Sequence, residues 1–327
     1  MSQADTLHIV IINFRTPDYT IDCLKSLEPE VQAVPGVKVL LVDNASGDDS
    51  VPMIQAALQE HGWTDWVTFL PEDRNHGFAG GNNVGLRKIL AMPEPPPFVL
   101  LLNSDTLVHP RCLQACLDSM RDHPEAGMMS CLLVNRDGTP RNAVHKFPYP
   151  RRETVRAFGL PYQFPRVFGW GDLEYSNWDR AAEPREVEWL AGAFMLIRTN
   201  VLQQIGLLSE EFFFYGEDTE FCHRMWKAGW TIRHEPCATT VHYGGGSSDE
   251  KKVRNARREA LQWAGRLKVQ RLCYGRWAEA WIRLVYLIAF GSRALLLRLL
   301  GKRGTDAYEY NQSQFSILIR SIEKQCL

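Results

Sequence analysis

Short apolar runs alternate with helix-like segments over the first 70 residues of the chain. The apolar runs are His8–Asn13, Val37–Val42 and Val67–Leu70, and the segments between them are Pro17–Leu27 and Val51–His61. Strands that alternate with helices in this way form a parallel sheet with right-handed crossover connections. The chain is therefore expected to be an α/β protein with a Rossmann-like, mostly parallel central sheet.

A further apolar run, Phe98–Leu102, ends in the polar residues Asn103, Ser104 and Asp105. Its uniform apolar character predicts a strand that is buried on both faces. Open α/β sheets bind their ligands at the carboxyl ends of such strands, but an Asp also suits an ordinary turn or helix cap. His242, which precedes a run of glycines, becomes a candidate metal ligand if a carboxylate such as Asp105 lies near it.

The stretch Asn75–Gly85 is rich in glycine and asparagine and precedes an expected helix at Leu86–Ala91. Glycines let a backbone approach a ligand closely, and the start of a helix favours an anion. The spacing is not G-x-G-x-x-G and follows the third strand, so a dinucleotide-binding fingerprint is not expected. The stretch is either a ligand-binding segment before the helix or a glycine-rich turn without a ligand.

The segment Asp137–Arg185 is rich in Pro, Arg and aromatic residues and has no clear period. Long loops of this kind are usually functional or mobile, and so many large aromatic residues argue against a disordered linker. We expect a loop-rich insertion that forms a lid or an acceptor-binding surface. A strand-like run, Val187–Arg198, follows it.

An apolar run, Phe212–Tyr215, leads through Gly216 into Glu217, Asp218 and Glu220. Carboxylates in the first turn of a helix interact favourably with the helix dipole, which is one explanation of this pattern. An apolar pocket beside them can also tune one carboxylate as a general base, which is the other explanation.

The carboxyl-terminal residues are basic although the net charge of the chain is −1. From Lys251 onward the chain has 16 Lys and Arg residues against 5 Asp and Glu residues. Apolar residues recur there at helical spacing, at Trp277, Trp281, Val285 and Ile288. The longest uncharged run, Leu284–Ser292, is shorter than the roughly 20 residues that span a bilayer. We expect residues 251–303 to lie on an anionic membrane; a helix docked on the body or on another subunit is the alternative.

The eight cysteines form no C-x-x-C pair, and the amino terminus lacks the basic and long apolar regions of a signal peptide. Free, mostly buried thiols in a reducing compartment are therefore expected. The predicted location is cytoplasmic, at the inner face of the cytoplasmic membrane. No nucleic-acid partner is expected, and the pattern leaves homo-oligomer formation open.

Six motifs in order give the chain its resemblance to a known family. They are VIINFRTP, LLVDNASGDDS, NHGFAGGNNVGL, LLLNSDTLVHP, the long block from WLAGAFMLIRT to GEDTEFCHRMWKAGW, and VHYGGGS. Together they resemble the inverting GT-A glycosyltransferases of family 2, in particular the bacterial rhamnosyltransferase-like branch. The resemblance covers roughly residues 7–247, and neither the insertion at 137–185 nor the carboxyl-terminal tail is a specific match.

The resemblance implies a donor site and a metal site. Asp43 takes the place of the residue that recognises uracil or thymine, and Asn103-Ser104-Asp105 takes the place of the D-x-D motif. Because Asn103 replaces the first Asp, only Asp105 is expected to bind Mn²⁺ or Mg²⁺ directly, with His242 completing the metal site. The remaining donor-binding residues are expected to be Asn13, Asn75, Gly80, Gly81, Asn83, Asn103 and Ser104.

The resemblance also implies the catalytic residues. Asp218 matches the catalytic base of the G-E-D-x-E block, and Glu217 and Glu220 would orient Asp218 or the acceptor. Gly192 and Ala193 are expected to form part of the acceptor-side wall.

The implied domain plan has a catalytic domain at 1–250 and a basic helical tail at 251–327. Residues 1–110 would bind the nucleotide sugar, and residues 111–250, with the insertion at 137–185, would bind the acceptor.

The expected activity is metal-dependent, inverting sugar transfer from a dTDP- or UDP-sugar to a lipid-linked or cell-surface glycan. Rhamnose from dTDP-rhamnose is the predicted donor sugar, with galactofuranose, galactose, N-acetylglucosamine or mannose as alternatives. A nucleotidyltransferase would require a G-x-G-rich signature and a basic residue after the first strand, and FRTPDY does not have that pattern. A non-catalytic nucleotide-sugar-binding subunit is the alternative from another functional class.

Overall fold

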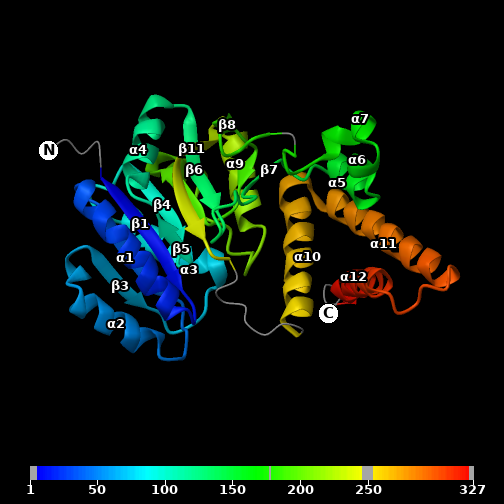
Figure 1. The fold of residues 1–327 in the computed structure, drawn as a ribbon, viewed down its shortest axis with the longest axis horizontal. Helices are drawn as coiled ribbons and strands as arrows, with labels where there is room; N and C mark the ends of the chain where they lie inside the picture. Colours follow the sequence, from blue (N-terminus) through cyan, green and yellow to red (C-terminus); the bar gives the residue numbers. More distant parts are fainter. Residues whose placement is uncertain (1–5, 177, 245–252, 324–327) are drawn as a thin grey trace. The chain divides into compact units, whose positions relative to one another are not determined.

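The computed structural model describes residues 6–176, 178–244 and 253–323. The chain divides into two compact units (Figure 1). The first, here called the sheet unit, comprises residues 1–145, 177–213 and 217–249. The second, here called the helical unit, comprises residues 146–176, 214–216 and 250–327. Parts of the insertion and three residues before Glu217 therefore group with the carboxyl-terminal helices.

The sheet unit is built on a nine-stranded sheet in which β3, β2, β1, β4, β10, β6, β11 and β5 follow one another, and β8 pairs with β11. The first four of these strands are parallel, β10 is antiparallel to β4 and β6, and β5 is antiparallel to β11. Their bounds are β1 Leu7–Asn13, β2 Lys38–Asp43, β3 Val67–Pro71, β4 Phe98–Asn103, β5 Thr106–Val108, β6 Ala126–Val134, β8 Arg185–Glu186, β10 Phe194–Arg198 and β11 Thr231–His242. Two further short strands, β7 Val144–His145 and β9 Trp189–Leu190, pair with each other.

Helices of the sheet unit lie between its strands along the chain, and those between β1 and β4 connect parallel strands, as the alternating pattern predicts (Figure 1). Their bounds are α1 Pro17–Ala33, α2 Ser50–Glu60, η2 Trp63–Asp65, α3 Gly77–Leu90, α4 Cys112–Asp122, α8 Thr199–Ile205 and α9 Glu217–Lys227. The apolar run Phe98–Leu102 is buried along its whole length, which confirms the expectation of a strand covered on both faces.

Two sequence expectations differ from the structure of this unit. Helix α3 begins at Gly77 and so contains most of the glycine-rich stretch that was expected to be a loop. The glycines are tolerated because α3 packs closely on β1: a Cβ atom at Gly85 would lie 2.7 Å from Val10. The run Val187–Arg198 is divided between β9 and β10 rather than forming one strand.

The helical unit surrounds its own apolar core. Its helices are α5 Pro150–Ala157, α6 Leu160–Gln163, α7 Pro165–Phe168, η3 Gly169–Gly171, α10 Val253–Tyr274, α11 Arg276–Leu299 and α12 Asp306–Glu323. The core includes Trp263, Ile282 and Phe290. Buried Glu153 accepts a hydrogen bond from the Tyr286 hydroxyl. Residues 146–176 were expected to be loop-rich, but they form short helices, and α5 packs against α11.

Among the described residues, α11 is by length and composition long and apolar enough to cross a membrane, and 33% of its apolar stretch is buried inside the fold. The apolar stretch of α11 is longer than the uncharged run Leu284–Ser292, on which the sequence expectation rested. Arg283 adds little exposed charge, since it is buried and bonds Glu279 at 2.9 Å. Core helices of soluble proteins have the same character, so this property alone assigns no membrane span.

The described cysteines fit the expectation of free thiols. They include six buried residues and the exposed Cys237, all without disulfides, and Cys326 lies outside the described residues.

Candidate active site

Asp105 and His242 meet at the turn between β4 and β5. Strand β5 pairs antiparallel with β11, and Thr106 lies opposite His242 in that register. The His242 Nε2 atom lies 3.2 Å from Asp105 Oδ1, and the Asn103 Nδ2 atom lies 3.5 Å from the same ring nitrogen. Both side chains of the ion pair are partly exposed, Asp105 by 13% and His242 by 14%. Asp105 therefore supplies the neighbouring carboxylate that makes His242 a candidate metal ligand.

Backbone contacts hold this pair in place. The Tyr243 N–H group donates to the Asp105 carbonyl at 2.9 Å. Arg141 Nη1 donates to the His242 carbonyl at 3.1 Å, a contact that the sequence gave no reason to expect. Residues 245–247 of the VHYGGGS motif lie outside the described part of the chain.

The atoms at this turn fit a divalent cation. A carboxylate oxygen and an imidazole nitrogen form a mixed ligand set that suits Mn²⁺, and Mg²⁺ prefers oxygen ligands in octahedral geometry. Neighbouring ligands of an octahedral ion with bonds of about 2.1 Å are about 3 Å apart. The 3.2 Å separation of Asp105 Oδ1 and His242 Nε2 is close to that value. The neighbouring Asn103 side chain is a neutral amide and adds no negative charge to the pair.

Asn13 and Asp43 form a buried network at the carboxyl ends of β1 and β2. Asn13 Nδ2 donates to Asp43 Oδ1 at 2.6 Å, and the Ser46 hydroxyl donates to the same oxygen at 2.6 Å. The Ser46 N–H group donates to Asp43 Oδ2 at 3.1 Å. Asp43 is only 1% exposed. The network fixes the carboxylate on the edge of the sheet where parallel strands place ligand-binding groups.

Asn44 joins this network to the start of α3. Its Nδ2 atom donates to Asn75 Oδ1 at 3.1 Å and to the Gly77 carbonyl at 3.0 Å, and its Oδ1 accepts from the His76 N–H group at 2.9 Å. Sequence reasoning missed the roles of Asn44 and Ser46. Their only signal was their position directly after Asp43 in DNAS.

Gly80, Gly81 and Asn83 lie inside α3. A Cβ atom at Gly81 would lie 3.1 Å from Ile12 Cδ1 and 3.2 Å from Asn44 Nδ2. The Asn83 side chain donates to the Leu208 carbonyl at 2.8 Å and to Glu210 at 2.9 Å. These contacts shape and anchor α3. Direct contact of the three residues with a nucleotide stays a prediction.

Helix α9 begins with two neighbouring carboxyl groups. Asp218 Oδ1 accepts from the Thr219 N–H group at 2.7 Å, and the Gly192 backbone also hydrogen-bonds to this carboxylate. Burial raises the pKa of Asp218 above its usual value, against the opposite effect of these hydrogen bonds. Burial and the neighbouring Asp218 charge raise the pKa of Glu217 to about 8. A carboxylate with a raised pKa is a stronger base.

Gly192 and Ala193 connect the two parts of the site. Gly192 bonds to Asp218, and the Ala193 carbonyl accepts from the Asn103 N–H group at 3.0 Å. A Cβ atom at Gly192 would lie 3.1 Å from the Phe78 ring, so a larger residue would collide there. The segment predicted as an acceptor-side wall thus contacts both Asp218 and Asn103, the last residue before the turn that carries Asp105.

Glu220 has a local partner. Its two carboxylate oxygens accept from Arg224 at 2.7 and 2.9 Å, and Arg224 also donates to the carbonyls of Ile205 and Leu207. This ion pair ties α9 to the end of α8. The predicted acceptor contact of Glu220 stays a prediction.

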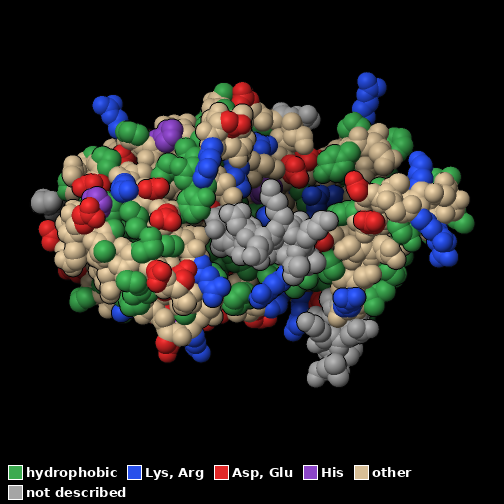
Figure 2. Space-filling view, turned by 60° about the horizontal axis from the view of Figure 1, so that its bottom comes forward, with side chains coloured by type: hydrophobic (Ala, Val, Ile, Leu, Met, Phe, Trp, Pro, Cys, Tyr) green, Lys and Arg blue, Asp and Glu red, His purple; other side chains and the backbone are tan. Residues whose placement is uncertain are grey.

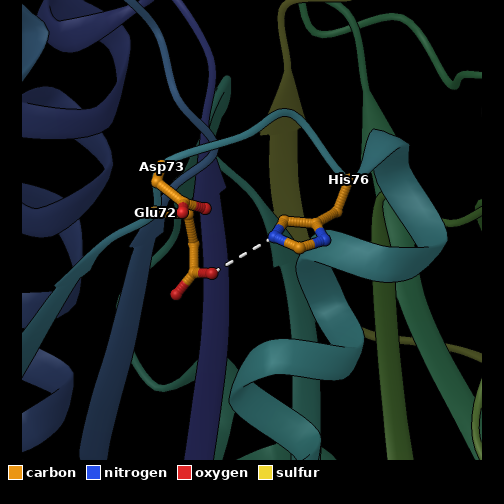
Figure 3. A group of neighbouring side chains, drawn as sticks. All are labelled: Glu72, Asp73 and His76. Atoms are coloured by element: carbon orange, nitrogen blue, oxygen red, sulfur yellow. Dashed lines mark hydrogen bonds and ion pairs between the residues drawn. The ribbon is translucent and has the colours of Figure 1, made fainter.

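A second group of metal-ligand atoms follows β3. One ligand atom each from Glu72, Asp73 and His76 lies within 4.8 Å of the others (Figure 3). Glu72 Oε2 and His76 Nε2 are 3.2 Å apart, while Asp73 is exposed. None of the sequence motifs indicated this group. Exposed acidic groups are common without a bound ion, so the geometry alone assigns it no metal.

Comparisons with known proteins show the family of the chain. The sequence model of the family described as glycosyltransferase-like family 2 matches residues 4–265. The N-acetylglucosaminyl-diphospho-decaprenol L-rhamnosyltransferase of Mycobacterium tuberculosis is 28% identical over 245 residues, which cover 73% of this chain and 76% of that protein. The low-salt glycan biosynthesis hexosyltransferase Agl10 of Haloferax volcanii is 27% identical over 238 residues, covering 73% of this chain and 67% of that protein.

A solved structure confirms the fold class. The mannosyltransferase of Pyrobaculum calidifontis, solved with GDP-Man and Mn²⁺, superposes with a TM-score of 0.53 at 16% identity, over 97% of this chain and 86% of that one. At this identity the likeness concerns the fold, which is the expected GT-A fold with a helical carboxyl-terminal part. The chain therefore belongs to the glycosyltransferase-like family 2 and is a glycosyltransferase of its rhamnosyltransferase-like branch.

Proposed function

We propose that this glycosyltransferase transfers a sugar from a nucleotide-sugar donor to a glycan hydroxyl with inversion, using a divalent cation and Asp218 as general base. The observation that carries the proposal is the Asp105–His242 pair at 3.2 Å. Gly192 and Ala193 connect the turn that carries Asp105 to the start of α9, where the pKa values of Glu217 and Asp218 are raised. One arrangement thus supplies both a cation site and a base.

Asp105 and His242 would hold Mn²⁺ or Mg²⁺, which supplies positive charge to a departing nucleotide diphosphate. Asp218 would accept the proton of the attacking acceptor hydroxyl. Its partly desolvated carboxylate is a stronger base than an exposed one, and general-base catalysis contributes typically about 10²–10⁴-fold. Buried Glu217, whose pKa is about 8, would keep its proton at neutral pH. The single negative charge of the two carboxyl groups would then lie on Asp218.

The donor side is proposed at the ends of β1, β2 and α3. Asp43 would recognise a thymine or uracil base, with Asn13 fixing its carboxylate. Asn75, Gly80, Gly81, Asn83, Asn103 and Ser104 complete the proposed donor set. The relative from Mycobacterium tuberculosis is named a rhamnosyltransferase, which supports dTDP-rhamnose, and the relative from Haloferax volcanii is named only a hexosyltransferase. Galactofuranose, galactose, N-acetylglucosamine and mannose donors therefore remain alternatives.

The acceptor is proposed to be lipid-linked, because the name of the Mycobacterium tuberculosis relative includes a diphospho-decaprenol carrier. Residues 1–250 would carry catalysis, with Gly192 and Ala193 on the acceptor side. The protein would act at the inner face of the cytoplasmic membrane in the synthesis of a cell-surface glycan.

The helical tail is the proposed membrane contact. Trp277, Trp281 and Leu299 are 75%, 51% and 76% exposed on α11. On the face drawn in Figure 2, Lys and Arg side chains project beside apolar ones in the helical part of the chain. Exposed Trp and Leu next to Arg fit an anionic bilayer surface, because the apolar side chains enter the interface while the cations meet the headgroups.

A thermal-shift screen of dTDP- and UDP-sugars, with and without Mn²⁺, tests donor and metal together. The proposal expects one donor to raise the Tm by several degrees only when Mn²⁺ is present. Turnover of that donor with an N-acetylglucosaminyl-diphospho-lipid then separates an enzyme from a non-catalytic binding subunit. Metal-independent donor binding would contradict the proposed cation site.

A further inference from the structure

The three residues that precede the acidic pair belong to a different compact unit from the pair itself. Phe214–Gly216 group with the carboxyl-terminal helices, while Phe213 and Glu217 on either side belong to the sheet unit. Within this short segment, Tyr215 and Gly216 have φ angles of +71° and +101°. A side-chain-bearing residue such as Tyr215 rarely adopts a positive φ, and such strain persists only where the surroundings hold it.

Helix α10 holds Tyr215 at two points. A Cβ atom at Gly265 would lie 2.2 Å from the Tyr215 carbonyl oxygen and 2.9 Å from its carbonyl carbon, so the helix backbone lies directly against this peptide group. Arg258 Nε donates to the Tyr215 hydroxyl at 3.0 Å. Arg258 and Gly265 are seven residues apart, which places them on one face of the helix. The contacts therefore fix both the main chain and the side chain of Tyr215.

The other end of the segment is fixed as tightly. The Phe213 carbonyl accepts a hydrogen bond from the Phe78 N–H group at 2.9 Å. A Cβ atom at Gly77 would lie 2.3 Å from the same oxygen. Along the chain, only Gly216 and Glu217 separate Tyr215 from Asp218.

From these contacts we infer that Gly265 and Arg258 are positioning residues for Asp218. They act through Tyr215, whose displacement would pass along two intervening residues to the carboxylate. The inference rests on the proposed role of Asp218 as the base. Misplacement of a catalytic group by about 1 Å can cost about 10²-fold in rate. The helical tail thus contributes to catalysis as well as to the proposed membrane contact.

The test uses the full-length protein with dTDP-rhamnose, Mn²⁺ and an N-acetylglucosaminyl-diphospho-lipid, and measures kcat, the acceptor KM and the donor Kd. Gly265→Ala is expected to lower kcat by about 10-fold or more and to leave the donor Kd within about twofold. Gly169→Ala is the matched control, because a Cβ atom there has nothing within 4 Å. It is expected to keep wild-type kcat. Wild-type kcat in Gly265→Ala, or an equal loss of donor affinity, would overturn the inference.

A second set of variants covers the case in which Gly265→Ala does not fold. Arg258→Gln and Tyr215→Phe each remove one partner of the same hydrogen bond. Each single variant is expected to lower kcat by about two- to fivefold. The double variant is expected to lower kcat by no more than either single variant. Arg258→Lys is expected to restore part of the lost kcat. Additive losses, or losses confined to the acceptor KM, would contradict a shared positioning role.

Asp218→Asn is measured beside these variants. If Asp218→Asn keeps full turnover, the proposed base is wrong. If Asp218→Asn is inactive while Gly265→Ala and Arg258→Gln keep wild-type kcat, only the positioning inference fails.

Discussion

The Nε2 atom of His242 lies 3.2 Å from Asp105 Oδ1, although the two residues are far apart in the chain. Antiparallel pairing of β5 with β11 creates this neighbourhood, because Thr106 lies opposite His242. Neither residue is buried enough to be explained by packing of the core, since both side chains keep 13–14% of their surface exposed. The pair is therefore available to a ligand as well as being fixed by the sheet.

Replacement of either ligand should weaken metal-dependent donor binding. For Asp105→Ala and His242→Ala we expect the donor Kd in Mn²⁺ to rise by about 10–100-fold, because each variant removes one of two protein ligands. Isothermal titration with the donor, in Mn²⁺ and in EDTA, measures the effect. His109→Ala, at an exposed histidine of the loop after β5, is the control. Unchanged affinity in Mn²⁺ would remove the altered residue from the metal site.

Replacement of the proposed base should affect turnover and leave donor binding intact. Asp218→Asn keeps the size of the side chain and removes its basicity, so we expect kcat to fall by about 10²–10⁴-fold. The donor Kd in Mn²⁺ should stay within about twofold. Asp22→Asn, at an exposed helix position, serves as the matched control. Turnover at the wild-type rate would show that another group takes the proton.

The stability of the donor-free protein should fall as the pH rises from about 4.5 to about 8. The pKa of Glu217 is raised from 4.5 to about 8 in the folded state. Over that range the unfolded chain releases this proton while the folded protein keeps it, so unfolding becomes more favourable with rising pH. A pKa shift of this size corresponds to a loss of at most about 5 kcal/mol in the free energy of unfolding.

Glu217→Gln should abolish that loss. Chemical denaturation at pH 5, 6.5 and 8 measures it as the difference between the variant and the wild type. Glu60→Gln, at an exposed carboxyl, should keep the wild-type pH dependence. A Glu217→Gln variant with the wild-type pH dependence would show that Glu217 is ionised in the folded protein.

The exposed face of α11 should bind anionic vesicles. Trp277→Glu and Leu299→Glu introduce negative charge at the most exposed apolar positions of this helix. Each is expected to reduce co-sedimentation with phosphatidylglycerol vesicles by about 10-fold, since burial of a charge in the interface is unfavourable. Met53→Glu, at an exposed apolar position of the sheet unit, is the control. Equal binding by all three variants would place the membrane contact elsewhere.

Local patterns were sufficient to predict the strands of the first half of the sheet. The run Phe98–Leu102 is buried as its composition requires, and the strands before it alternate with helices as expected. The start of α3 was missed because Gly80 and Gly81 have low helix propensity. A Cβ atom would lie 2.7 Å from His76 at Gly80 and 3.1 Å from Ile12 of β1 at Gly81, and these close contacts become visible only in three dimensions.

The site required information that no local pattern contains. Asp105 and His242 meet through strand pairing, and Gly192 reaches Asp218 through the arrangement of β10 and α9. Motif order could indicate these residues only by family resemblance. Asn44 was indicated only by its place after Asp43 in DNAS, and Arg141 lay in no motif, although both anchor predicted site residues. The contact between Gly265 and Tyr215 likewise depends on packing inside the helical unit.

The anomeric configuration of the product tests the central claim most directly. The wild-type protein is incubated with dTDP-rhamnose, Mn²⁺ and the N-acetylglucosaminyl-diphospho-lipid, and the new glycosidic bond is analysed by NMR. A single displacement with Asp218 as base predicts a product with the configuration opposite to that of the donor. The product should form in Mn²⁺, be absent in EDTA and form about 10²–10⁴-fold more slowly with Asp218→Asn. A product that keeps the donor configuration, or that forms equally in EDTA, would contradict the account.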